Sequence, residues 1–372
     1  MPSADLIQEI DRQLTICNAC RYCEGYCAVF PAMELRRTFD KEDILYMANL
    51  CFECRACYNA CPYTPEHEYD INIPKVLSQL RVETYQEYAT PRLLSKLLFN
   101  RAGAVLGLLL GSIGLIFALV WAFQGSDVLF ESNTEEGAFF DVIPYLAITV
   151  PAMLLSGYWL AVLSIGGVRF WRDTKGRTGQ MFSWAAFLKA SKDAFGLEYM
   201  KGGGEGCDYP TAAKSRARFW SHHLLVWGIA LNFVATSWAA ILHNVLGSDG
   251  PYPYVSGPVI SGVVGGVMIL LGAVGLLWLK ARSDKGPAEA KMLSMDVAFL
   301  ALLLLASVTG LLLLALRESA AMGALLVIHL GVIAALYLTL PYGKFAHVVY
   351  RYAALVKYQI EMSRTAPRAA GH

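Results

Sequence analysis

Charged residues are scarce in this sequence, since Asp, Glu, Lys and Arg make up 16% of it against 56% for hydrophobic residues. After residue 102 this scarcity leaves six apolar runs of about the 20 residues that cross a bilayer: 103–123, 142–165, 224–246, 255–279, 297–316 and 322–340. One large soluble core would not produce six such runs. The net charge of +1 gives no reason to expect a nucleic-acid partner. The sequence therefore predicts a mainly α-helical chain with a six-helix transmembrane bundle.

Motifs for substrate chemistry are also missing. The glycine-rich segment 202–207 follows no predicted strand and lacks a phosphate-binding lysine pattern, so we interpret it as a tight loop. The chain has no dinucleotide fingerprint and no flavin-attachment motif. These absences predict no catalytic residues in this chain, and they assign any carbon–hydrogen or hydride chemistry to another subunit.

Eight of the nine cysteines form the run C-x2-C-x2-C-x3-C twice, at Cys17, Cys20, Cys23 and Cys27 and at Cys51, Cys54, Cys57 and Cys61. Such runs wrap [4Fe–4S] clusters, and in the bacterial two-cluster arrangement the fourth cysteine of each run binds the other cluster. We therefore predict that Cys61 joins Cys17, Cys20 and Cys23 at cluster 1, and that Cys27 joins Cys51, Cys54 and Cys57 at cluster 2. Structural zinc is the main alternative, although zinc sites usually pair two cysteines with ligands at longer range. Disulfides are disfavoured, because nothing before Cys17 resembles a secretory signal.

These patterns divide the chain into residues 1–90, an α-helical ferredoxin-type domain with two clusters, and residues 91–372, the transmembrane domain. We expect helices at residues 34–50 and 75–88, an amphipathic turn at 92–101, and a helix at 181–199 within the loop 166–221. Lys and Arg near span ends stay in the cytoplasm. Ten lie in 169–218 and four in 280–291, whereas 124–141 and 247–254 have none. Both termini and the cluster domain are therefore predicted to be cytoplasmic, with 169–218 as a basic docking surface.

Histidine is rare inside membrane spans and usually functional there. The 18-residue step from His329 to His347 makes about five helical turns and returns to the same face, about 27 Å along the axis. His222 and His243 lie near opposite ends of the third span. Because the third and sixth spans run antiparallel, His222 is predicted to meet His347 at an inner site and His243 to meet His329 at an outer site. His223 is the alternative to His222.

Two imidazoles facing each other across a bundle are the ligand set of a low-spin b-type haem, which transfers electrons. Two such pairs favour two haems, though one haem, or zinc or copper at these histidines, is also compatible with the pattern. The expected architecture is thus a two-[4Fe–4S] domain followed by a cytochrome b-like bundle.

Several segments together resemble the tricarballylate/citrate utilisation protein B family. They are the double cysteine run, Arg218-Phe-Trp-Ser-His-His, Ala235-Thr-Ser with His243 beyond it, and His329-Leu-Gly leading to Leu340-Pro-Tyr-Gly-Lys-Phe-Ala-His347. The resemblance implies a multi-pass protein of the bacterial inner membrane, with iron–sulfur clusters and haem, that reoxidises a separate FAD-dependent tricarballylate dehydrogenase. The histidine step also resembles that of nitrate reductase γ-type cytochromes b, over the spans alone.

The predicted function is electron transfer from that cytoplasmic flavoprotein, acting on tricarballylate or a citrate-like tricarboxylate, through the clusters and haem to membrane quinone. The chain would then be the electron-transfer subunit of an oxidoreductase, not the subunit that oxidises the substrate. Two alternatives stay open. In the first, quinol drives the same carriers backwards to feed a cytoplasmic reductase; in the second, the chain is a non-catalytic iron–sulfur membrane anchor or sensor.

Overall fold

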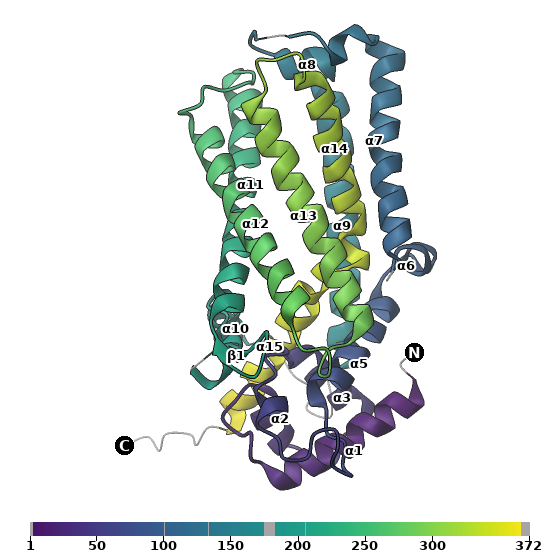
Figure 1. Cartoon of the computed structure of the whole chain (residues 1–372), viewed down its shortest axis with the longest axis vertical. Coiled ribbons are helices and arrows are strands. Elements are labelled where there is room, and N and C mark those ends of the chain that lie inside the picture. The colour runs from purple at the N-terminus through teal and green to yellow at the C-terminus, as the bar shows by residue number, and fades with distance from the viewer. Residues whose placement is uncertain (1–2, 100, 133, 175–182, 205, 366–372) are drawn as a thin grey trace.

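Six long helices stand side by side above a smaller helical domain in the computed structural model of this chain (Figure 1). The structure describes residues 3–99, 101–132, 134–174, 183–204 and 206–365. Within these residues the fold is helical apart from one two-residue strand pair, in which β1 (Cys207–Asp208) pairs antiparallel with β2 (Lys214–Ser215). The mainly α-helical prediction is confirmed.

The six predicted spans are confirmed as helices. They are α7 (Ala102–Gln124), α9 (Tyr145–Asp173), α11 (Ala217–Leu246), α12 (Gly257–Arg282), α13 (Ala290–Ala315) and α14 (Met322–Thr339). All six are long and apolar enough to cross a bilayer, the sixth when counted on to Tyr342. Many of their large apolar side chains face outward, such as Phe123, Phe233 and Leu271. Because water would penalise this exposure and lipid would not, the chain is a multi-pass membrane protein.

The third and fourth spans approach closely through glycine. A Cβ atom at Gly228 of α11 would lie 2.8 Å from the carbonyl oxygen of Gly265 in α12, and one at Gly272 would lie 2.7 Å from that of Ser221. Only glycine permits backbones this near to each other, as is common between membrane helices. This packing sets the rotation of α11, which carries three of the histidines.

The N-terminal domain packs five helices around the cysteine loops: α1 (Ala4–Cys20), α2 (Val29–Glu34), α3 (Lys41–Leu50), α4 (Ala56–Asn59) and α5 (Ile73–Tyr88). The expected single helix over residues 34–50 is wrong. Asp40 begins α3 instead, because its side chain accepts a hydrogen bond from the Asp43 amide as an N-cap. The helix expected at 75–88 is present as α5, which begins two residues earlier, after the Asn72 cap.

Short elements connect the two regions. α6 (Arg92–Leu98) precedes the first span, and η1 (Asp127–Leu129) and α8 (Ala138–Val142) lie at the far end of the bundle. α10 (Trp184–Phe195), η3 (Glu198–Met200) and η4 (Gly202–Gly204) lie between α9 and α11, and η5 (Leu340–Tyr342) and η6 (Lys344–Ala346) follow α14. The loop predicted over 166–221 is shorter, because α9 continues to Asp173 and α11 begins at Ala217. Residues 175–182 of that loop lie outside the described residues.

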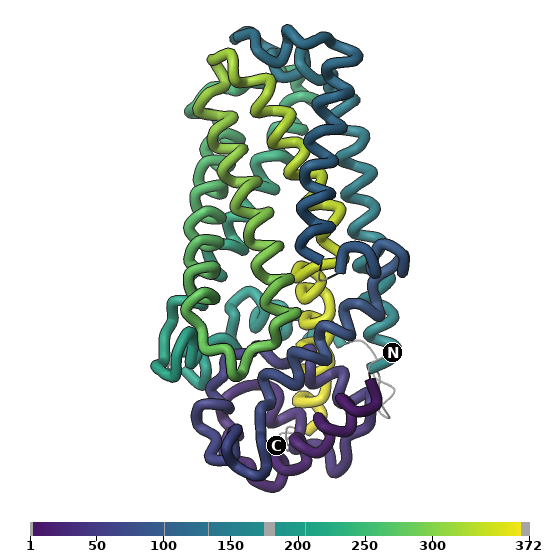
Figure 2. The backbone as a smooth tube through the Cα atoms, turned by 45° about the vertical axis from the view of Figure 1, so that its right-hand side comes forward, coloured from purple at the N-terminus to yellow at the C-terminus, as the bar shows by residue number. Residues whose placement is uncertain are grey.

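The last helix, α15 (His347–Thr365), returns from the bundle into the cysteine domain, where it packs against α3, α9 and α10 (Figure 2). Its Glu361 forms an ion pair with Arg36 at 2.6 Å. The first residue of this helix is His347, so one rigid element joins a predicted haem ligand to the cysteine domain.

Candidate redox site

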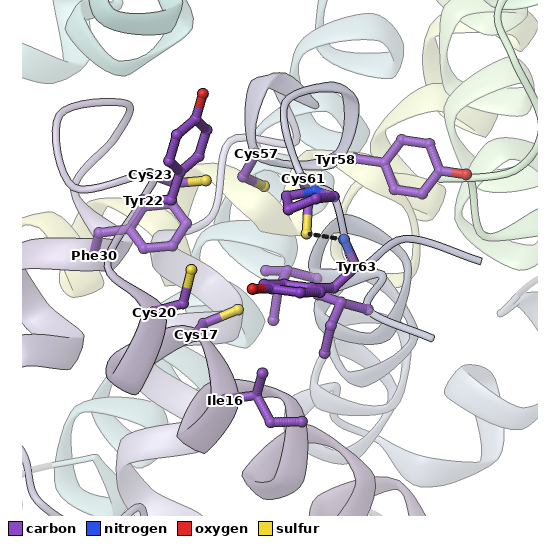
Figure 3. Close-up of a pocket in the computed structure, with 13 residues that line it drawn as sticks. Ile16, Cys17, Cys20, Tyr22, Cys23, Phe30, Cys57, Tyr58, Cys61 and Tyr63 are labelled. Carbon is purple, nitrogen blue, oxygen red and sulfur yellow. Dashed lines mark hydrogen bonds between the residues drawn. The ribbon is translucent and has the colours of Figure 1, made fainter. Parts of the chain in front are cut away.

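The first cysteine run begins on the last turn of α1, where Cys17 and Cys20 lie three residues apart on one face. Arg21 ends this helix in the left-handed conformation, with φ of 55°, and the chain turns back past Cys23. Figure 3 shows Cys17, Cys20 and Cys23 around one pocket, with Cys57 and Cys61 entering from the second run. The structure therefore brings Cys61 to the first run.

Burial and neighbouring sulfur atoms make ionisation of these thiols unfavourable without a metal. The pKa of Cys17 is raised to about 12 by burial and then by the thiolates of Cys61, Cys23 and Cys20. A cluster would bind the deprotonated forms and release these protons. The three cysteines that raise the pKa of Cys17 are the same three that are predicted to bind cluster 1 together with it.

The second group is more deeply buried. The pKa of Cys27 lies well above its ordinary value because of burial and then of Cys54 and Cys51. Burial raises that of Cys57 in the same way, followed by Cys54, Cys27 and Cys51. The structure therefore brings Cys27 to the second run, in the crossed arrangement, while the ligand roles of all eight cysteines stay a prediction.

Backbone amides point at several of the sulfur atoms, as a cluster requires. The Tyr63 amide donates to Cys61 Sγ at 3.3 Å (Figure 3) and the Glu53 amide to Cys51 Sγ at 3.4 Å. Glu53 and Arg55 adopt positive φ on either side of Cys54, which turns the loop around that sulfur. No three His, Cys, Asp or Glu side chains within the described residues are grouped tightly enough for one metal ion.

A set of buried and part-buried cations surrounds the second cysteine run, and sequence patterns did not predict it. Arg81, 1% exposed, forms an ion pair with Glu53 at 2.9 Å and donates to the carbonyls of Ala48 and Cys51 at 3.0 and 3.1 Å. Burial opposes ionisation of Glu53, but neighbouring cations hold its pKa below the ordinary value: Arg81, Lys344, Arg218 and Lys280. Local periodicity gives no sign of this set, because its members are up to 300 residues apart in sequence.

His222 and His347 face each other where the bundle meets the cysteine domain. Their ring centres lie 6.4 Å apart and their planes are at 86°. Two metal–nitrogen bonds of about 2 Å each, together with the half-widths of two imidazoles, give about 6 Å between ring centres. The separation therefore fits one metal atom between the two rings.

The remaining ring atoms also fit axial ligation. His347 Nδ1 donates to the carbonyl oxygen of Lys344 at 2.6 Å, which leaves Nε2 as the metal-binding atom. Burial holds the pKa of His347 well below its ordinary value, with Arg351 and Lys344 adding to the effect, so the ring is neutral. His222 Nδ1 is buried and has no hydrogen-bond partner among the described residues. His223 instead packs edge-on against Phe219, with ring centres 4.5 Å apart. The geometry favours His222 over His223.

The other predicted pair is not brought into ring contact in the described structure. His243 Nδ1 forms a hydrogen bond with Asp249 Oδ1 at 2.5 Å, and the centre of its ring lies 3.7 Å from that of Tyr145. His329 Nδ1 bonds to the Thr309 hydroxyl at 2.9 Å, and its ring lies against Gly310. An outer haem between His243 and His329 therefore stays a prediction with less geometric support than the inner site.

The family model described as citrate utilization protein B matches residues 98–370, and the model of the Fer4-like domain of the same protein matches residues 10–87. A citrate utilization protein B from Escherichia coli is 42% identical over 360 residues, which cover 96% of this chain and 93% of that protein. The chain belongs to the citrate utilization protein B family. No solved structure matches it.

Membership confirms the resemblance drawn from the cysteine and histidine segments. The Fer4-like match indicates an iron–sulfur domain that coincides with the helices α1 to α5, and the larger match covers the membrane bundle. The boundary between the two matches falls at α6, close to the boundary predicted at residue 90.

Proposed function

We propose that this citrate utilization protein B family member carries electrons between a cytoplasmic FAD-dependent tricarballylate or citrate-like dehydrogenase and the membrane quinone pool. Two [4Fe–4S] clusters and a b-type haem would supply the one-electron redox chemistry. The bundle would lie in the bacterial inner membrane, with both termini and the cysteine domain in the cytoplasm. The strong excess of lysine and arginine in 169–218 and 280–291 supports this orientation.

The observation that carries the proposal is the position of the facing histidines. His222 and His347 lie at the end of the bundle nearest the cysteine domain, and α15 connects this site directly to that domain. An anchor or sensor would not need two neutral imidazoles at the separation of axial ligands beside two cysteine sites. Lys344 orients one ring through its carbonyl, and Gly228 allows the close approach of α11 that places the other.

A pocket near the same end of the bundle is the position we propose for quinone. It lies between the start of α7, the first half of α13 and η5. Ala298, Phe299 and Leu302 supply apolar walls, and Ser294 supplies a hydroxyl group, a composition suited to a hydrophobic ring that carries a carbonyl oxygen. Gly343 in its wall directly precedes Lys344, whose carbonyl holds His347.

Purified protein reconstituted in lipid with quinone and the partner flavoenzyme tests the proposal. Haem and clusters should be reduced when tricarballylate or citrate is supplied, and a quinone analogue should then be reduced in turn. Membranes without this chain should not reduce the analogue. Equal rates in both membranes, or purified protein without haem and clusters, would overturn the proposal.

A further inference from the structure

Two arginines connect the histidine pair to the second cysteine run. Arg218 lies one helical turn before His222 in α11, and Arg351 lies one turn after His347 in α15. Arg218 donates to the carbonyls of Glu53 and Phe52 at 2.7 and 3.2 Å. Arg351 donates to the carbonyl of Cys51 at 2.9 Å, and its guanidinium lies 4.5 Å from the centre of the Phe52 ring. Through these arginines, both helices that carry the facing histidines thus donate hydrogen bonds to the same three-residue segment, 51–53.

Arg218 interacts with the Cys207 thiol and, at longer range, with Glu53. Within the part of the chain that the structure describes, neither Arg218 nor Arg351 forms an ion pair with a carboxylate, and Arg351 Nε is buried without a hydrogen-bond partner. Arg218, which the sequence placed on a basic docking surface, points inward instead. Both guanidinium groups are part-buried with an incomplete counter-charge, which is costly, so the arrangement points to a further anionic group that completes it.

The wider surroundings have the same imbalance. Six cations interact there with three carboxylates of the described residues, Glu53, Asp284 and Asp296; the cations are Arg55, Arg81, Arg218, Lys280, Lys344 and Arg351. Cys51 and Cys54 lie against these cations, and Arg81 and Arg351 both donate hydrogen bonds to the Cys51 carbonyl.

The first cysteine run has different surroundings. Cys20 is exposed, and Tyr22 beside it is 66% exposed. The nearby Arg21 is exposed and Arg12 is paired with Glu9 at the surface, so no comparable buried cations face this run in the described structure. The two cysteine sites therefore differ in electrostatics even though their motifs are the same.

We propose, on the basis of the function proposed above, that the Cys51–Cys54–Cys57 site with Cys27 is the inner site coupled to the histidine pair. Arg218 and Arg351 are its positioning residues. They hold segment 51–53 against both histidine helices, and their charges favour the more negative, reduced form of a cluster bound there. The inner site consequently has a higher reduction potential than the exposed site of Cys17, Cys20, Cys23 and Cys61, which faces the electron donor.

A redox titration of the full-length protein followed by electron paramagnetic resonance tests this assignment. Arg351→Gln and Arg218→Gln should each make one cluster harder to reduce by about tenfold in the reduced-to-oxidised ratio, about 59 mV for one electron, while the other cluster and the iron content stay unchanged. Arg351→Lys, which keeps the charge, should restore most of the potential. Arg12→Gln, at an exposed ion pair, is the matched control and should shift neither signal.

Cys20→Ser identifies the signals, because it alters the spectrum of the exposed site alone. The proposal is overturned if Arg351→Gln shifts the same signal that Cys20→Ser alters, or shifts both or neither. If each Gln variant loses the iron of one site, the positioning role is still supported, provided that Arg351→Lys keeps the wild-type potential and the remaining cluster of the Gln variants has its normal potential. Loss of iron from both cysteine sites contradicts the proposal. Wild-type protein without any cluster signal would instead refute the proposed function itself.

Discussion

Replacing Arg81 by methionine should destabilise the cysteine domain strongly, although Arg81 is not a predicted cluster ligand. Its guanidinium is buried, pairs with Glu53 at 2.9 Å and satisfies the carbonyls of Ala48 and Cys51 at the end of α3. Methionine fills a similar volume but leaves Glu53 with Arg55 at 3.9 Å as its nearest ion-pair partner. Breaking one side of a buried ion pair costs about 3–5 kcal/mol.

That loss is large enough to measure as a shift in melting temperature. At about 4 °C per kcal/mol for a domain of about 90 residues, the midpoint should fall by roughly 12 °C or more. The assay is thermal loss of cluster absorbance in purified full-length protein under anaerobic conditions. Arg12→Met is the matched control, because the Arg12–Glu9 pair is about 40% exposed on both sides and is worth less than about 1 kcal/mol. A shift for Arg81→Met no larger than that of the control would refute the importance of the buried pair.

Four further outcomes are expected. Anaerobically purified protein should contain about eight cluster iron atoms, and stoichiometric zinc without a cluster signal would contradict this. The Cys207→Ser variant should keep the same iron content, because Cys207 lies outside both runs. His222→Leu should remove one haem band from the optical spectrum and His223→Leu should remove none, and the reverse result would exchange their roles. Burial lowers the pKa of Lys344 to about 8, below that of an unfolded lysine. The cost of burying the charged amine is therefore fully present below pH 8, and the free energy of unfolding should rise between pH 8 and 10 by up to about 1.4 kcal/mol per pH unit. Urea titrations should show that Lys344→Met loses this rise. Ala298→Trp should slow quinone-analogue reduction while dithionite still reduces the haem at the normal rate, and an unchanged quinone rate would exclude the pocket.

Much of the architecture was predictable because it depends on local patterns. Apolar runs with few charges predict spans whatever they pack against, and all six are present with ends displaced by up to eight residues. Helix boundaries depend on single side-chain contacts, which explains the failure at residues 34–50, where the Asp40 cap divides the predicted helix. The family was also recognisable, since its cysteine and histidine segments are contiguous in sequence.

The candidate site was predictable only in part. Spacing along a helix follows from 3.6 residues per turn, so the shared face of His329 and His347 could be calculated. The direction in which that face points depends on packing with other helices. His329 turns toward Thr309 and Gly310, and His243 turns toward Tyr145, neither of which the periodicity indicates.

The sequence by itself determined the number of spans, the two cysteine sets and the family, because each depends on residue types at short, regular spacing. Only the tertiary structure decided that His222 rather than His223 faces His347, and that Arg218 and Arg351 leave the basic surface to hold segment 51–53. Rotation of a helix about its axis and the partners of a buried charge are set by contacts between segments up to 300 residues apart. Such contacts are energetically decisive in a low-dielectric interior, yet they leave no periodic trace in the chain.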